Sequence, residues 1–370
     1  MGQREGAILT QRQVSALWGD RPSSGNGHEG VASVEGQRKT TKLIEIKGEY
    51  GDIPVAFVGD AGYIVGGDGD EIRRWQVNDG KEAGQPVNAG SEVCSIAASR
   101  DGKWIVCGTW SGQVVVWDAE SHKKVSEFRG HDRVMYAVDI SPDAMRVASG
   151  SWDDGTVRVW SRSTGEKLLG PLKHRGWVAV VKFSPDGQFI ATATWERESI
   201  RVYDSRDGRL LFDSLIKVGW FCNQSLAWDS DSKQLFALSG DGKVHCLDVA
   251  NGRILSEWAI HSNNFTKCIA LAINGAFIAA SARSSVSFWD TATCKQIGPL
   301  IHHPGGVWYM AISANDDLVL SGEKKIVLQK LPNILPSSFF DLVGVFRCQR
   351  DAIHHDSLGA ADTQSHLPVG

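Results

Sequence analysis

The stretch GHDRVMYAVDISPDAMRVASGSWDDGTVRVW, residues 130–160, decides the fold. It contains short runs rich in Val, Ala and Ile, such as residues 134–141, which are followed by turn residues such as SPDA at 141–144. Runs of about five to eight such residues between turn signals are typical of strands buried on both faces, and they are too short for helices. The stretch therefore predicts short strands joined by tight turns.

The strand that ends this stretch recurs along the chain. In similar strands, the residue aligned with Trp160 is followed by an acidic residue in most cases. We call this aligned position the slot, and it is occupied by Trp75, Trp117, Trp160, Tyr203, Leu247, Trp289 and Gln329. Successive slots are about 40–44 residues apart, which is close to the repeat length of a four-stranded propeller blade. The period predicts an all-β fold with seven blades.

Other features keep the same phase as this slot. A histidine lies about 29 residues before it, as at His131 and His174, and a turn similar to SPDG follows the first strand of several repeats. A glycine such as Gly165 comes about five residues after the slot, where a hairpin needs a positive φ that only glycine adopts freely. Several features at one period indicate a true repeat.

On these motifs the chain resembles the WD40 repeat family over about residues 41–330. The resemblance implies a seven-bladed β-propeller. In the repeat at 130–160 it also implies a hydrogen-bonded tetrad made of His131, Ser149, Asp154 and Trp160. An indole only donates, a hydroxyl donates and accepts, and an imidazole can link a hydroxyl to a carboxylate.

Three repeats depart from the family pattern. Ser111 stands where the tetrad needs Asp, Leu247 replaces the Trp of its blade, and Gln329 ends a degenerate last repeat. We expect these blades to depend on packing alone.

The last repeat has no fourth strand, because the sequence LPNILPSS follows Leu331. The strand-like segment TKLIEIKG, residues 41–48, has no blade of its own, so we expect it to complete blade seven and close the ring. The expected organisation is a flexible extension at 1–40, a propeller at 41–331 and a tail at 332–370. In the tail, FFDLVGVFRCQ predicts a short helix before a disordered end.

The composition is that of an ordinary globular chain, with 42% hydrophobic and 22% charged residues. A net charge of −4 and a pI of about 6.3 argue against nucleic acid as a partner. No long apolar run and no signal peptide are present, so no membrane contact is expected. Seven cysteines without paired spacing indicate reduced thiols. We expect an intracellular protein, cytoplasmic rather than nuclear.

The search for catalytic, cofactor or metal residues nominates none. GDGK at 240–243 lacks the rest of a phosphate-binding loop, and GGDGDE at 66–71 lacks the further oxygens of a calcium loop. The pair His302 and His303 is better explained as a tetrad position. We therefore expect no enzyme activity.

The remaining candidate is the rim that carries the loops between strands d and a and between strands b and c, which usually binds partners in the WD40 family. The residues that we expect to bind a partner there are Trp110, Trp152, Trp195, Trp177, Trp308, Tyr136, Arg133 and Arg197. Trp, Tyr and Arg are typical of interface hot spots. The alternative is that the aromatic rings fill gaps between the blades.

These observations support two hypotheses on function. The first is a scaffold that holds protein or peptide partners on this rim, with the propeller monomeric inside a larger complex. The second is a sensor or adaptor related to signalling ATPases, because the sequence is similar in style to the WD40 arrays of fungal NACHT-type proteins. Fold alone does not choose between them.

Overall fold

The computed structural model describes residues 44–48, 53–59, 62–195, 200–216, 218, 224–260, 266–271 and 275–340. The chain divides into two compact units, residues 1–40 and residues 41–370, and every described residue belongs to the second. The expected extension at 1–40 therefore lies outside the described residues, as do residues 341–370 of the expected tail.

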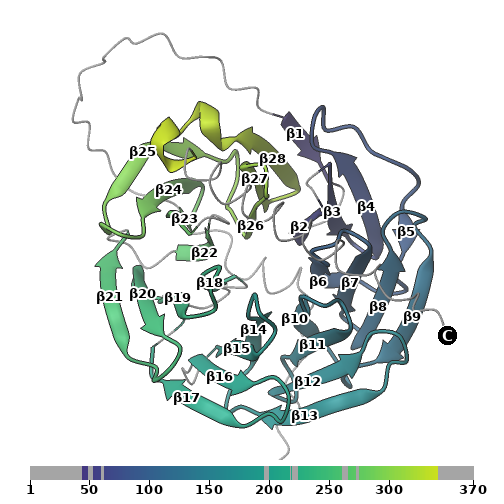
Figure 1. The fold of residues 1–370 in the computed structure, drawn as a ribbon. Coiled ribbons are helices and arrows are strands. Elements are labelled where there is room, and N and C mark those ends of the chain that lie inside the picture. Colours follow the sequence, from purple (N-terminus) through teal and green to yellow (C-terminus); the bar gives the residue numbers. More distant parts are fainter. Residues whose placement is uncertain are drawn as a thin grey trace, which may run out of the picture. The chain divides into compact units, whose positions relative to one another are not determined.

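The described strands form seven four-stranded sheets, which are arranged as the blades of a ring (Figure 1). In each blade, strands a, b, c and d follow one another from the centre outward. Blades 1 and 2 contain β2 Val55–Val58, β3 Tyr63–Asp68, β4 Glu71–Gln76, β5 Val87–Asn88, β6 Val93–Ala98, β7 Trp104–Thr109, β8 Gln113–Asp118 and β9 Lys124–Arg129. Blades 3 and 4 contain β10 Met135–Ile140, β11 Arg146–Ser151, β12 Thr156–Ser161, β13 Lys167–Lys173, β14 Val178–Phe183, β15 Phe189–Thr194, β16 Ile200–Asp204 and β17 Leu210–Ser214.

The other three blades repeat this plan. They contain β18 Leu226–Trp228, β19 Gln234–Leu238, β20 Lys243–Asp248, β21 Ile254–Ala259, β22 Thr266–Leu271, β23 Phe277–Ala282, β24 Ser285–Asp290, β25 Gln296–His302, β26 Tyr309–Ile312, β27 Asp317–Gly322, β28 Lys325–Lys330 and β1 Ile44–Lys47. The predicted all-β, seven-bladed propeller is confirmed. In the part of the chain that the structure describes, no helix is long and apolar enough to cross a bilayer.

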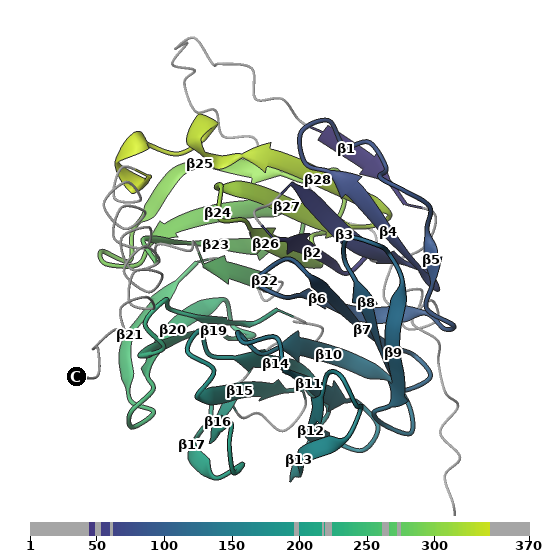
Figure 2. The same cartoon turned by 45° about the vertical axis from the view of Figure 1, so that its right-hand side comes forward.

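Strand β1 closes the ring. It pairs antiparallel with β28 along its whole length, with Ile44 opposite Leu328 and Lys47 opposite Lys325. Figures 1 and 2 both place β1 on the outer side of β28, where the d strand of blade 7 belongs. The predicted closure by the N-terminal strand is confirmed, and it removes a sheet edge that an open array would expose.

The core lies between the blades, so the inner strands are buried on both faces. Strands β7, β11 and β15 are buried at every position except the first. The outermost strands β9 and β13 are mostly exposed. This explains why apolar and small residues dominate the second strand of each repeat, and it makes each blade a rigid support for the loops at its ends.

The hairpins between strands c and d need left-handed residues. Gly165 has φ of 69°, and a Cβ there would lie 2.8 Å from the Phe128 ring of the preceding blade. Glycine at this position therefore avoids both the strain of a positive φ and a clash with the ring. His122 and Cys294 take the equivalent position in other blades, with φ of 55° and 56°.

After the last blade the chain forms two short 3-10 turns, Leu331–Asn333 and Ser337–Phe339. The rings of Phe339 and Phe340 pack edge-on against Phe277, with centroids 6.2 and 6.0 Å away. Of the segment FFDLVGVFRCQ, only Phe339 and Phe340 are described, and they lie in and just after the second 3-10 turn. The rest of the predicted helix lies outside the described residues.

Candidate functional site

Blade 3 contains a complete hydrogen-bonded tetrad. The Trp160 indole donates to Ser149 Oγ at 2.8 Å, and Ser149 Oγ lies 2.8 Å from His131 Nε2. His131 Nδ1 lies 3.1 Å from Asp154 Oδ2. A carboxylate only accepts, so Nδ1 carries the proton and Nε2 accepts from the hydroxyl. These hydrogen bonds connect strand c, through strand b, to the d–a loop and the b–c loop of the same blade.

The Asp154 carboxylate is the charged end of this tetrad. It also accepts from Thr156 Oγ1 at 2.8 Å and from Arg158 Nη2 at 3.0 Å. Burial acts to raise the pKa of Asp154, but the hydrogen bond from His131 and its electrostatic attraction, together with the Thr156 bonds, hold it at about 2. The folded blade therefore favours the ionised carboxylate.

This pKa predicts a pH window for the contribution of Asp154 to stability. Its folded pKa of about 2 lies below the ordinary value of 3.8, so the contribution is complete above pH 3.8 and disappears as the pH falls toward 2. We expect the melting temperature of the wild type to fall more steeply over this window than that of Asp154→Asn. Calorimetric scans at several pH values, with Glu120→Gln as the exposed control, measure the difference. Parallel curves for wild type and Asp154→Asn would contradict it.

Other blades replace the tetrad with different contacts. In blade 2, Cys107 takes the register position of Ser149, and burial raises its pKa to about 12 although the indole of Trp117 acts to lower it. In blade 5, where Leu247 replaces Trp, His245 Nε2 lies 3.1 Å from Ser239 Oγ. Neither of these contacts links as many elements as the blade 3 tetrad, so blades 2 and 5 depend more on side-chain packing for their stability.

The upper rim is the rim that carries the d–a and b–c loops, including residues 130–134 and 152–155 of blade 3. Trp110, Trp152 and Trp195 follow directly after strands β7, β11 and β15 on this rim. Their backbone N–H groups donate to the carbonyls of Glu92, Val134 and Trp177, at 2.8, 3.1 and 2.9 Å respectively. These bonds fix each b–c loop to the start of strand a in its own blade.

The aromatic residues of blades 3 and 4 form one cluster on this rim. The Trp152 ring lies 4.8 Å from Tyr136, 4.9 Å from Trp177 and 5.6 Å from Trp195, measured between centroids. Tyr136 and Trp195 are also in contact, at 5.6 Å. Trp110 of blade 2 packs with Trp152 against the buried group that contains Tyr136. We call Trp110, Tyr136, Trp152, Trp177 and Trp195 the aromatic rim.

The members of the aromatic rim differ in exposure, which corrects part of the sequence analysis. Trp195 is only 2% exposed and Tyr136 only 6%, so their rings are buried, which agrees with the alternative of the sequence analysis and not with the partner contact that it expected. Trp110, Trp152 and Trp177 are partly exposed. The two buried rings form the base on which the partly exposed rings rest.

A small residue of strand a lies in the buried group that contains Trp195. Where blade 3 has Tyr136 at the bulge of strand a, the register of blade 4 places Ala179, which is fully buried in the same cluster as Trp195. A small residue alone does not bury the indole, because blade 2 has Cys94 at this position and its Trp110 is partly exposed.

Three other residues that we expected to bind a partner are not members of the aromatic rim. Trp308 is partly buried in blade 7, where it packs with the core group of β1 and blade 1 and its backbone N–H donates to the Ser321 carbonyl. Arg133 is exposed on the d–a loop before β10. Arg197 lies outside the described residues.

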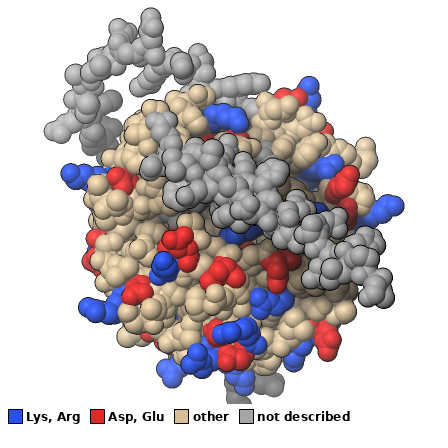
Figure 3. Space-filling view, viewed as in Figure 1, with Lys and Arg blue, Asp and Glu red and all other residues tan. Residues whose placement is uncertain are grey.

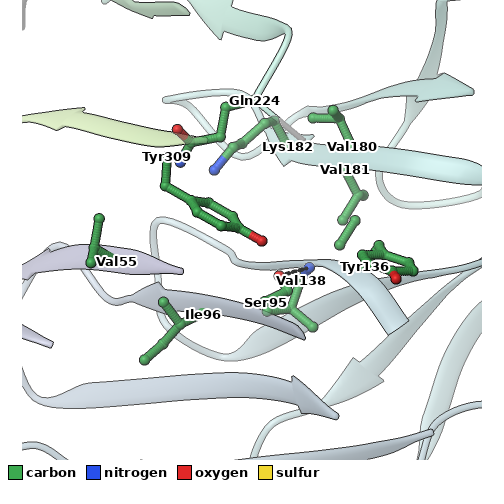
Figure 4. A pocket seen from close by; sticks show the side chains of 11 residues that line it. Val55, Ser95, Ile96, Tyr136, Val138, Val180, Val181, Lys182, Gln224 and Tyr309 are labelled. Carbon is green, nitrogen blue, oxygen red and sulfur yellow. Dashed lines mark hydrogen bonds between the residues drawn. The ribbon is translucent and has the colours of Figure 1, made fainter. Parts of the chain in front are cut away.

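A small pocket lies along the central channel, lined by residues of strands a (Figure 4). Its polar groups connect neighbouring strands: the Val138 N–H donates to Ser95 Oγ at 2.9 Å, and the Met310 N–H donates to Gln224 Oε1 at 2.6 Å. These bonds hold blade 3 to blade 2, and blade 7 to the segment before blade 5. The arrangement supports the ring.

A half-buried carboxylate near this channel also has a structural role. Asp139 Oδ2 accepts from the Phe183 N–H at 2.7 Å, and Asp139 Oδ1 lies 3.7 Å from Lys182 Nζ. Burial raises the pKa of Asp139, and the neighbouring lysine charge and the backbone bonds oppose this only in part. The contact connects blade 3 to blade 4.

On the visible part of the face in Figure 3, acidic and basic residues are interspersed around the ring. Among the described residues, no group of three or more His, Cys, Asp and Glu side chains is placed to hold a metal ion. Within these residues, the aromatic rim is therefore the feature that best fits a binding role.

Comparison with known proteins agrees with the fold. The family model described as "WD domain, G-beta repeat" matches residues 84–118, 122–161 and 166–204. The chain is 24% identical to Autophagy-related protein 16 of Arabidopsis thaliana over 264 residues, which are 70% of this chain and 43% of that protein. It is 33% identical to Protein FIZZY-RELATED 3 of the same plant over 22% of this chain and 18% of that protein.

A third relative is the guanine nucleotide-binding protein G(I)/G(S)/G(T) subunit beta-1 of Homarus americanus, 33% identical over 16% of this chain and 18% of that protein. The chain thus spans less than half the length of these curated relatives. With the geometry above, these matches define the class: a seven-bladed β-propeller that contains WD40 repeats. Propellers of this class are generally non-catalytic and bind other proteins.

Proposed function

We propose that this chain is a non-catalytic scaffold that binds a protein or peptide partner through the aromatic rim. The partial exposure of Trp110, Trp152 and Trp177 above two buried rings is the observation that carries the proposal. Partly exposed aromatic side chains on a firm base are typical of interface hot spots, because they bury a large area at little cost in side-chain entropy.

The rigidity of the rim favours this use. Each b–c loop is bonded to strand a before a partner arrives, and the rings of blades 3 and 4 already pack on one another. Little conformational freedom is then lost when the partner binds, so more of the contact energy contributes to affinity.

The relatives support a role within an assembly, since one of them is named as the beta subunit of a guanine nucleotide-binding protein. For this chain we propose one propeller within a larger protein complex in the cytoplasm, with neither nucleic acid nor membrane as its partner.

Single substitutions of the exposed indoles test this function. We expect Trp110→Ala, Trp152→Ala and Trp177→Ala each to reduce partner capture by about tenfold or more, as loss of a hot-spot ring does. The measurement is affinity purification of the tagged chain from its native cell, with quantitative mass spectrometry of the proteins recovered. Near-ultraviolet circular dichroism of each variant checks that the fold is retained.

Trp104→Ala is the matched control. Trp104 begins β7, which Trp110 follows directly, so the two indoles lie at opposite ends of one strand and both are partly exposed. Trp104→Ala should capture the same proteins as the wild type. If all four variants recovered partner proteins as well as the wild type does, a role for the aromatic rim would be refuted.

A further inference from the structure

The hairpin between strands c and d of blade 5 contains an asparagine followed by a glycine, Asn251 and Gly252. Both residues lie between β20 and β21, at the other end of strand c from the upper rim, and Asn251 is exposed to water. This pair of residues favours spontaneous deamidation, because glycine has no Cβ to hinder attack of its own backbone nitrogen on the preceding side chain. The sequence and the exposure therefore mark Asn251 as a candidate modification site.

Three hydrogen bonds engage the groups that would react. The Gly252 nitrogen donates to the Asp248 carbonyl at 2.7 Å. The Asn251 side chain donates from Nδ2 to Asp248 Oδ2 at 2.7 Å, and its Oδ1 accepts the Arg253 N–H at 2.9 Å. Attack requires the Gly252 N–H to be released and the Asn251 side chain to turn, so the reaction must wait for the hairpin to open locally.

Blade 4 has a carboxylate at this position of its own c–d hairpin, together with a cation. Asp204 ends strand c there, and Asp207 takes the place of the asparagine. The guanidinium of Arg206 binds Asp204 Oδ2 at 2.7 Å, which reduces the repulsion between the two carboxylates. In blade 5, Ala250 stands in the place of Arg206. A new carboxylate at position 251 would therefore lie beside Asp248 without the arginine that blade 4 has.

We propose that Asn251 is a site of spontaneous deamidation, that opening of the c–d hairpin of blade 5 controls its rate, and that its product keeps this hairpin open more often. The Gly252 nitrogen loses its proton and bonds to the side-chain carbonyl carbon of Asn251, while the bond from that carbon to Nδ2 breaks and ammonia leaves. Water then opens the cyclic imide to aspartate or isoaspartate. The new carboxylate cannot donate to Asp248, and it repels that side chain instead.

Peptide mapping by mass spectrometry of the whole chain tests the control of the reaction. We expect Asn251 to deamidate at neutral pH at least about tenfold more slowly in the native chain than in the chain unfolded in guanidinium chloride. Asp248→Ala removes the acceptor of the Asn251 side chain and should speed the reaction in the native chain. Asp204→Ala, the equivalent change in blade 4, is the matched control and should leave the rate at Asn251 unchanged. Circular dichroism checks that both variants fold.

Two results of this mapping would overturn the proposal. One is an equal rate of deamidation in the native and the unfolded wild type, which would mean that the hairpin does not control the reaction. The other is an equal rate in native wild type and native Asp248→Ala, which would mean that the bonds to Asp248 do not hold the reacting groups.

Asn251→Asp supplies one product of the reaction directly. We expect amide hydrogen exchange at Gly252, whose N–H donates to the Asp248 carbonyl, to be about fivefold faster in this variant than in the wild type. Adding Ala250→Arg restores the charge pattern of blade 4 and should return the exchange toward the wild-type rate. Unchanged exchange in Asn251→Asp, or fast exchange that the arginine fails to slow, would contradict the proposed effect of the product.

Discussion

Deletion of residues 41–48 is expected to abolish cooperative thermal unfolding of the propeller. The deletion removes β1, which pairs with β28 along its whole length. It also removes Ile46, a buried member of the core group that contains Trp75 and Leu328. Loss of a buried isoleucine costs about 2–5 kcal/mol, and each lost backbone hydrogen bond about 0.5–1.5 kcal/mol. Together these losses approach the total stability of a typical domain, about 5–15 kcal/mol.

Differential scanning calorimetry of the purified chain measures this effect. The truncated chain should lack the transition, or melt more than about 15 °C below the wild type. Ile46→Asp should act in the same direction without shortening the chain, and Lys47→Ala, at the exposed end of the same strand, is the control. A truncated chain that melts like the wild type would contradict closure by β1 as the source of stability.

The fold could be predicted from the sequence because each blade repeats the same local requirements. Gly165 is needed for a tight hairpin, and the slot at Trp160 ends a strand that must be buried on both faces. Such requirements depend on a few neighbouring residues, so they recur at a fixed period and can be counted. Closure was predictable for a similar reason, since residues 41–48 had strand character but no blade.

The exposure of the rim could not be predicted in the same way. Trp152 and Trp195 occupy the same position of successive repeats, yet only Trp195 is fully buried. The structure associates this difference with Tyr136 in one blade and Ala179 in the next. The size of that residue is no sufficient signal, because Cys94 stands there in blade 2 and Trp110 is partly exposed.

Trp195→Ala is expected to destabilise the propeller by about 3–5 kcal/mol, the usual cost of truncating a buried tryptophan. The indole is among the largest fully buried side chains of the described residues, and it packs in the group that contains Ala179 and Ala193. Small neighbours cannot move in to fill the space of a lost ring, so a cavity remains between the blades. Trp152 also loses part of its support.

Urea unfolding at 25 °C, followed by circular dichroism, measures the loss. Trp110→Ala is the comparison, because that ring is partly exposed and should cost clearly less. Trp195→Phe should recover part of the stability, since it restores part of the ring volume. If Trp195→Ala were as stable as the wild type and failed only in partner capture, Trp195 would be a contact residue, as the sequence analysis first expected. A large loss of stability instead makes it the base on which the exposed rings depend.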